Sequence, residues 1–265
     1  MDLQLKGKLA LISGSTGGIG YAIAASMARE GCRVIINGRA QKRVDAALAK
    51  LAGSLGPSAD AVGFAADLGT VPGVAQIVAR FPQVDILVNN MGIFEPKPFE
   101  EIPDEDWNRF FEVNVLSGVR LSRHYLPRMR AVGWGRIIFI SSESAVQIPA
   151  EMIHYGMTKT AQLAVSRGLA ETTAGTGVTV NSVLPGPTAS EGVGGFVDNM
   201  AANRGTDRST IEREFFQNVR PSSLLQRFAT PDEVAALVTF VASPLSAATN
   251  GSALRVDGGV VRSII

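Results

Sequence analysis

Residues 9–20 of the chain read LALISGSTGGIG, and this stretch decides the fold. Its apolar start at 9–12 predicts a short buried strand, and residues 19–30 predict a helix. Gly14, Gly18 and Gly20, at the junction of these elements, have the spacing G-x-x-x-G-x-G. Glycine allows a tight turn whose backbone N–H groups approach a pyrophosphate, and the N-terminus of the next helix adds partial positive charge. Such a turn between a first strand and a first helix indicates a dinucleotide-binding unit.

Apolar runs and helical stretches alternate along the rest of the chain. Further strands are predicted at 34–36, 62–65, 85–88, 136–140, 178–184 and 253–256, and helices at 42–55, 74–81, 104–132, 155–173 and 231–242. This alternation predicts an α/β fold, a doubly wound parallel sheet of about seven strands with helices on both faces. We expect one domain over residues 1–265, with ligands at the carboxyl ends of the strands. We also expect Pro127 to bend or end its helix, and Thr230 to cap the last one.

Residues 186–229 interrupt the alternation because they contain no clear strand. Their apolar side chains predict a substrate flap docked over a cleft, since so long a connection is usually functional or disordered. A surface insertion without a role in binding is the alternative.

Composition excludes several classes of function. The net charge is +1, with 46% hydrophobic and 18% charged residues, so no global field attracts nucleic acid or an anionic membrane. Five arginines between positions 120 and 136 are interpreted as a solvated helix face. The two histidines are too far apart in sequence to predict a metal site. The single cysteine, Cys32, is expected to be a buried thiol. With no signal peptide or membrane span, we expect a cytoplasmic protein.

The end of the second strand predicts which cofactor is preferred. An acidic residue there would bind the ribose 2′-OH of NAD, but the chain has Asn37, Gly38 and Arg39. Arg39 can pair with a 2′-phosphate, which predicts a preference for NADP(H) over NAD(H). If Arg39 is only a solvated charge, an NAD-linked alcohol dehydrogenase is the alternative.

A tyrosine and a lysine on one helix face predict proton chemistry. Tyr155 and Lys159 are four residues apart, so they share a face of the helix at 155–173. A nearby ammonium is expected to lower the pKa of a tyrosine, which then exchanges a proton with a carbonyl or alcohol oxygen. Ser142 ends the fifth strand, where its hydroxyl can orient the carbonyl, while Ser141 should point to the other face. Glu143 either faces the pocket mouth or is a solvated loop residue.

These motifs, in this order, resemble the short-chain dehydrogenase/reductase family from position 8 to 259. The resemblance rests on the glycine turn, the Tyr-x-x-x-Lys pair, the sequence NNMG at 89–92 and the sequence RVDGG at 255–259. It is most similar to the single-domain branch that contains 3-oxoacyl carrier-protein reductases. The family implies a Rossmann fold and a homotetramer. Where relatives have alanine, Met91 is expected near either the cofactor or the central sheet.

The resemblance also implies roles for individual residues. It implies that Asn114 supports a proton relay through water to Lys159, although a buried polar residue at a helix irregularity is the alternative. The catalytic set is then Asn114, Ser142, Tyr155 and Lys159. The residues predicted to bind the cofactor are Gly14, Ser15, Thr16, Gly18, Ile19, Gly20, Arg39, Asp67, Leu68, Asn90, Gly92, Tyr155, Lys159, Pro185, Gly186 and Thr188.

The predicted function is hydride transfer between NADP(H) and a carbonyl or secondary alcohol, with Tyr155 as the acid or base. A non-catalytic cofactor-sensing regulator on the same fold is the alternative. An enoyl-type reductase is disfavoured because those relatives place the tyrosine and lysine further apart. The predicted pocket walls are Ile93, Phe94, Ser144, Ile148, Met152 and Phe196. These walls favour a hydrophobic ketone or a 3-oxoacyl thioester, with no nucleic-acid or membrane partner.

Overall fold

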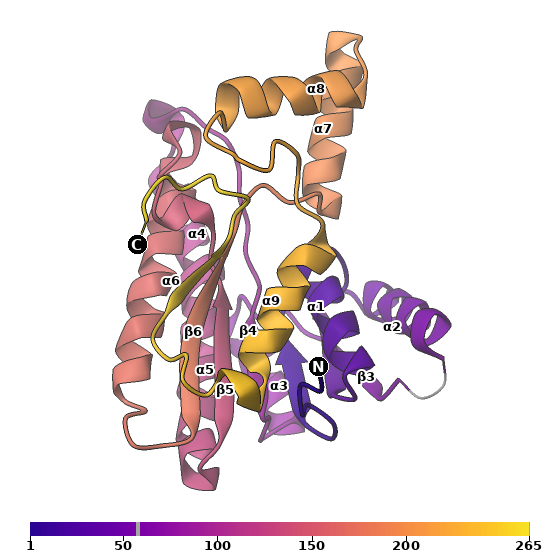
Figure 1. The fold of residues 1–265 in the computed structure, drawn as a ribbon, viewed down its shortest axis with the longest axis vertical. Coiled ribbons are helices and arrows are strands. Elements are labelled where there is room, and N and C mark those ends of the chain that lie inside the picture. The colour runs from indigo at the N-terminus through magenta and orange to yellow at the C-terminus, as the bar shows by residue number, and fades with distance from the viewer. Residues whose placement is uncertain (57–58, 265) are drawn as a thin grey trace.

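A seven-stranded parallel sheet forms the centre of the molecule (Figure 1). The computed structural model describes residues 1–56 and 59–264, apart from the side chains of Glu191, Phe196 and Asn199. The strands are β1 Leu9–Ile12, β2 Arg33–Gly38, β3 Ala61–Ala65, β4 Ile86–Asn89, β5 Gly135–Ile140, β6 Val178–Pro185 and β7 Ala253–Val256. Their order is β3-β2-β1-β4-β5-β6-β7, so the chain changes direction across the sheet between β1 and β4. The predicted fold is confirmed, and this switch point is where open sheets bind ligands.

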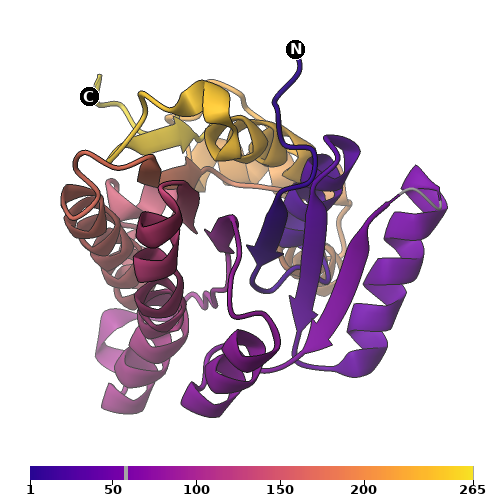
Figure 2. The same ribbon diagram turned by 90° about the horizontal axis from the view of Figure 1, so that it is seen from below.

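Helices cover both faces of the sheet (Figure 2). One layer contains α1 Gly18–Arg29, α2 Gln41–Leu55 and α9 Pro231–Ala242, and the other contains α3 Val71–Arg80, α5 Ser117–Val132 and α6 Ile153–Glu171. Alternate strand residues belong to the two cores: Ile12 packs towards α1 and α9, and Leu11 towards α3 and α5. Short turns of helix complete the chain at η1 Phe99–Glu101, η3 Glu143–Ala145, η4 Ala150–Met152 and η6 Pro244–Ser246.

The predicted helix at 104–132 is divided by a π-helical turn. The structure has α4 Asp104–Phe111, then η2 Glu112–Leu116 with π geometry, and then α5. Pro127 lies inside α5, which continues to Val132, so this proline does not end the helix, and the bend expected as the alternative stays a prediction. The helix ends instead at Gly133, whose φ of 78° gives a left-handed C-cap that favours glycine.

Two predictions about single residues have clear outcomes. Cys32 is buried, as expected. Arg136 is not part of a solvated helix face, because it is a buried residue of β5. Its guanidinium donates to the backbone carbonyls of Gly135, Gly177 and Ser243, which replace the water that it loses on burial.

Within the described residues, we find no helix that is long and apolar enough to cross a bilayer.

Residues 186–229 form a helical unit at one end of the sheet (Figure 1). It contains α7 Glu191–Arg204, α8 Arg208–Glu214 and the π turn η5 Phe215–Val219. These helices were not predicted, although Ser190 and Asp207 are N-caps of the favoured residue types. They accept hydrogen bonds from Val193 N and Thr210 N. The unit has a small apolar core of Val197, Ala201, Ile211, Phe216 and Phe228.

Candidate active site

The glycine turn after β1 is held by the end of β4. Ser13 Oγ accepts from the backbone N–H groups of Asn90 (3.0 Å) and Met91 (3.1 Å). Asn90 Nδ2 donates back to Ser13 O (2.9 Å) and Gly14 O (3.1 Å). A Cβ on Gly20 would lie 2.5 Å from both Asn90 Nδ2 and Gly14 O, so no side chain fits there. Asn90, predicted to bind the cofactor, therefore shapes the turn at which a pyrophosphate would lie.

Asn37 at the end of β2 is a buried structural residue. Its Oδ1 accepts from Gly14 N (3.1 Å), and its Nδ2 donates to Phe64 O (3.1 Å) and Ala66 O (3.1 Å). The side chain thus joins the glycine turn to β2 and β3. Arg39, two residues later, is exposed. Of the residues at this strand end, Arg39 is the one free to reach a group bound outside the sheet.

Gly38 lies beneath the glycine turn. A Cβ at Gly38 would be 2.5 Å from Thr16 Cγ2, so the turn packs directly on the backbone of β2. Gly14 and Gly18 have φ values of 62° and 55°, which is the left-handed region that favours glycine. A Cβ on Gly18 would lie 3.3 Å from Ser190 Cβ, so the start of α7 reaches over the same turn.

The residues that follow β3 and β4 lie side by side at the switch point. Asp67 is half-buried, and its Oδ1 accepts from Gly69 N (3.0 Å), whereas Leu68 is buried in the core. Met91 packs on that core, and its methyl end lies 3.2 Å from the position of a Cβ on Gly69. The same side chain lies beside the glycine turn, near Gly14. Met91 therefore meets both of its expected neighbours, the sheet core and the cofactor-side loops.

Tyr155, Lys159 and Ser142 meet at the base of a cavity. Lys159 Nζ lies 5.6 Å from the centre of the Tyr155 ring, and Ser142 lines the same cavity as both residues. The lysine is buried and donates to Ile140 O (2.9 Å). Ser141 Oγ instead donates to Lys159 O (2.9 Å), which agrees with its expected orientation away from Ser142. The structure thus brings together three of the four residues of the predicted catalytic set.

Burial dominates the electrostatics of this group. It lowers the pKa of Lys159 to about 8, although the Glu143 carboxylate opposes this change. It raises the pKa of Tyr155, and the Glu143 carboxylate raises it further. The expected lowering of the tyrosine pKa is therefore not present in the protein by itself, because desolvation of the phenolate and the Glu143 carboxylate outweigh the lowering by Arg220.

Asn114 lies in the π turn η2 and reaches the active site through other residues. Its side chain accepts from Ile93 N (2.8 Å) and donates to Ile93 O (3.0 Å) and Thr158 Oγ1 (3.0 Å). Its backbone carbonyl accepts from Gln162 Nε2 (2.5 Å), and Gln162 Oε1 accepts from Lys159 Nζ (3.4 Å). The helix irregularity that we considered as an alternative is thus present, and Gln162 links Asn114 to Lys159. Gln162 was not predicted from the sequence, although it lies three residues after Lys159 on the same helix.

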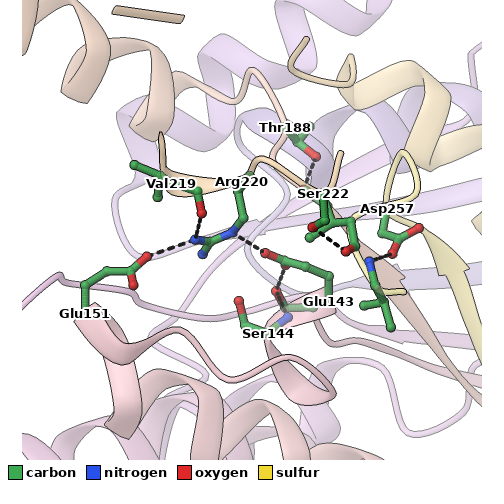
Figure 3. A network of polar contacts seen from close by, with 12 residues as sticks. Glu143, Ser144, Glu151, Thr188, Val219, Arg220, Ser222 and Asp257 are labelled. Carbon is green, nitrogen blue, oxygen red and sulfur yellow. Dashed lines mark hydrogen bonds and ion pairs between the residues drawn. The ribbon is translucent and has the colours of Figure 1, made fainter. Parts of the chain in front are cut away.

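Glu143 lines the cavity and is not a solvated loop residue, because it is buried beside Ser142. Its Oε2 accepts from Ser142 Oγ (2.5 Å), and its Oε1 accepts from Arg220 Nε (3.2 Å). Arg220 is also buried, and its Nη1 donates to Glu151 Oε1 (3.0 Å) and Val219 O (3.0 Å). Figure 3 shows Arg220 between the two carboxylates. The 186–229 segment therefore supplies a cation to the active site, which the sequence analysis missed.

The cavity above these residues has a volume of about 580 Å³. Of the predicted walls, Ile93, Phe94, Ser144 and Met152 line it, together with Val193, Val197, Met200, Ile211, Phe215 and Phe228. Ile148 lies outside this lining, because it packs over Gly156 and stays 45% exposed. The side chain of Phe196 lies outside the described residues. Pro185, Gly186 and Thr188 also line the cavity, and Thr188 Oγ1 donates to Gly186 O (2.9 Å).

Comparisons with known proteins agree with this geometry. A family model described as enoyl-(acyl carrier protein) reductase matches residues 14–261. The Bacillus subtilis oxidoreductase YvaG is 50% identical over 266 residues, with full coverage of both chains. The D-beta-hydroxybutyrate dehydrogenase of Cupriavidus necator is 34% identical, covering 97% of this chain and 99% of that protein. The solved structure of Gluconobacter frateurii L-sorbose reductase, complexed with NADPH and L-sorbose, has a TM-score of 0.93 at 31% identity over the whole of both chains.

Proposed function

The chain belongs to the short-chain dehydrogenase/reductase family, and from this premise we propose that it reduces a small carbonyl compound with NADPH, or oxidises the corresponding alcohol. Its relatives are oxidoreductases and dehydrogenases, and hydride transfer with a nicotinamide cofactor is the activity they support. The observation that carries the proposal is the meeting of Tyr155, Ser142 and Lys159 at the base of one cavity. Neither this site nor the relatives support a non-catalytic regulator.

The residues around the glycine turn fit a dinucleotide. The N-terminus of α1 is open, with no acidic residue in its first turn and no side-chain cap, which suits a bound pyrophosphate. The position of a Cβ on Gly92 lies 3.4 Å from Lys159 Nζ, so a ribose can lie over this glycine within reach of the ammonium. Bound NADPH would supply the hydride that reduces the carbonyl carbon.

The protein residues would hold the oxygen and move its proton. Tyr155 would give its phenolic proton to the carbonyl oxygen during reduction, or take it back during oxidation. Ser142 would orient that oxygen, and Lys159, still charged at neutral pH, would stabilise the phenolate. The sequence separation of Tyr155 and Lys159 favours this chemistry over enoyl reduction, despite the description of the matching family model.

The test is consumption of NADPH with a panel of carbonyl compounds that the relatives' names suggest. The panel contains L-sorbose, acetoacetate and a 3-oxoacyl thioester, because the relatives include a sorbose reductase, hydroxybutyrate dehydrogenases and a 3-oxoacyl carrier-protein reductase. Tyr155→Phe should lower kcat at least 100-fold with little change in NADPH affinity. Equal turnover in the variant and the parent would remove Tyr155 from the mechanism.

We also propose a preference for NADP(H), supported by the exposed Arg39 at the end of β2 and by the NADPH in the sorbose reductase complex. Relatives differ here, because a 7α-hydroxysteroid dehydrogenase of the same fold is complexed with NADH. Arg39→Ala should raise the KM for NADPH and leave the KM for NADH unchanged. A variant whose ratio of the two KM values equals the parent's would refute the proposal.

The 186–229 segment is proposed to be the substrate flap. Its support is that residues of α7, α8 and η5 line the cavity opposite Tyr155. Because these walls are mostly apolar, a hydrophobic ketone or an acyl thioester remains in the panel beside the sugar. A cytoplasmic homotetramer stays a prediction of the family resemblance, and sedimentation velocity would test the tetramer.

A further inference from the structure

The buried ion pair between Glu143 and Arg220 sits against the proposed catalytic residues. Glu143 belongs to η3, directly after Ser142, and Arg220 follows η5 at the end of the 186–229 segment. The side chains of both residues are more than nine-tenths buried. A buried carboxylate is costly unless it is paired, so this arrangement needs an explanation beyond surface charge.

The hydrogen bonds of Ser142 show what the carboxylate does. A serine hydroxyl has one proton, and that of Ser142 is donated to Glu143 Oε2 at 2.5 Å. Ser142 Oγ also accepts from Ser144 N (3.1 Å), and Ser142 and Tyr155 line the same cavity. With its proton directed to Glu143, Ser142 has one lone pair left for the cavity, which can accept from a substrate alcohol or from Tyr155. Glu143 therefore fixes both the rotamer of Ser142 and the direction of its proton.

We propose that the Glu143–Arg220 pair is a positioning device for the reaction: Glu143 holds the Ser142 hydroxyl at the cavity wall that it shares with Tyr155, and Arg220 keeps that carboxylate compensated. This inference rests on the proposed function. Because Arg220 comes from the 186–229 segment, the active site has its correct charge only while that segment lies over the cavity. The segment thus contributes to the reaction itself as well as to the pocket wall.

The other charges around Tyr155 are few. Lys159 faces it from α6, and Glu151 of η4 touches Arg220 but lies beyond the ion pair. Arg204 and Glu214, from α7 and α8, pair with each other on the far wall (2.7 Å). Arg220 is therefore the group that balances Glu143 directly. Without it, an uncompensated carboxylate would lie beside Ser142 and disfavour the Tyr155 phenolate.

A double-mutant cycle separates this role from simple anchoring of the segment. Arg220→Met leaves a buried, unpaired carboxylate, whereas Glu143→Gln removes the charge but keeps an oxygen that accepts from Ser142. The combination Glu143→Gln/Arg220→Met removes both charges together. If Arg220 only anchored the segment, the combination would be as impaired as Arg220→Met, because the anchor is still missing.

The experiment measures kcat and KM against pH for the alcohol formed from the best panel ketone, with NADP⁺. We expect Arg220→Met to lower kcat at least tenfold and to move the rising limb of the profile upward by about one pH unit. Glu143→Gln should move that limb downward. The combination should recover most of the kcat lost in Arg220→Met. The rising limb of its pH profile should lie near the pH of the parent's. An unmoved limb in both single variants, or no recovery in the combination, would overturn the proposal.

Glu171→Gln is the control, because it removes a carboxylate from an exposed ion pair with Arg167 that lies outside the cavity lining. Its kcat and KM should stay within twofold of the parent's values at each pH. Fluorescence titration of NADPH checks that each variant is folded and binds the cofactor. If the parent turns over no panel compound, the proposed function fails. Ultraviolet titration of each variant against its own Tyr155→Phe counterpart still tests the inference, since the phenolate should form at lower pH in Glu143→Gln than in the parent. Identical titration of the two would refute it.

Discussion

Replacing Asn37 with alanine should destabilise the fold at the cofactor edge. The side chain is buried and makes three hydrogen bonds, one from Gly14 N and one each to Phe64 O and Ala66 O. Each such bond contributes about 1 kcal/mol net, and its loss leaves a buried backbone group without its partner. We therefore expect Asn37→Ala to lower the free energy of unfolding by about 3 kcal/mol. At roughly 2–4 °C per kcal/mol for a chain of this size, Tm should fall by roughly 6–12 °C.

The assay is urea unfolding followed by circular dichroism, with Arg39→Ala as the control. Arg39 lies two residues away on the same strand end but is exposed, so its removal should change the free energy of unfolding by less than about 0.5 kcal/mol. If both variants unfold at the same urea concentration as the parent, the structural role given to Asn37 is wrong. A large decrease in the free energy of unfolding of Arg39→Ala would likewise show that the two positions have been assigned the wrong roles.

Three further predictions concern the turn, the lysine and the last helix. Gly20→Ala should weaken NADPH binding at least tenfold by fluorescence titration, because its Cβ would lie 2.5 Å from Asn90 Nδ2 and distort the turn; unchanged affinity would contradict this. Folded Lys159 loses its proton above pH 8, whereas the unfolded lysine keeps its proton up to about pH 10.5. The free energy of unfolding of the parent should therefore rise relative to that of Lys159→Met from pH 8 to 9.5, by at most about 1.4 kcal/mol per pH unit. A constant difference between the two proteins in urea unfolding over that range would refute the pKa. Thr230→Ala should lower the free energy of unfolding by about 1 kcal/mol, because the capping box with Glu233 is lost. An unchanged urea midpoint would show that the capping box does not stabilise the fold.

Sequence patterns predicted the parts of the structure that depend on local periodicity. The helix Pro231–Ala242 and the strand Ala253–Val256 have the predicted bounds, because a proline after a capping threonine and a short alternating run are local signals. The glycine turn was also predictable, since its steric requirements lie within a few residues.

The parts that depend on distant pairing could not be predicted. Glu143 and Arg220 are 77 positions apart, and neither lies in a motif that requires the other. A buried ion pair has no periodic pattern, so the sequence left Glu143 between two alternatives and did not single out Arg220. Gln162 was missed for a related reason, because its role depends on the π turn that brings the Asn114 carbonyl to it. Ile148 was predicted to be a wall from its neighbourhood in sequence, but its side chain lies over Gly156 instead.

The packing of Thr16 on Gly38 limits how the cofactor preference of this chain can evolve. A carboxylate at position 37 would lose the two bonds that Asn37 donates, and a side chain at position 38 would meet the Thr16 methyl group at 2.5 Å. Either substitution alone disturbs the packing around the glycine turn without a compensating change nearby. A switch to NAD therefore requires coupled substitutions in the turn and the strand. A library that varies positions 16 and 38 together should yield such variants, whereas one that varies either position alone should not.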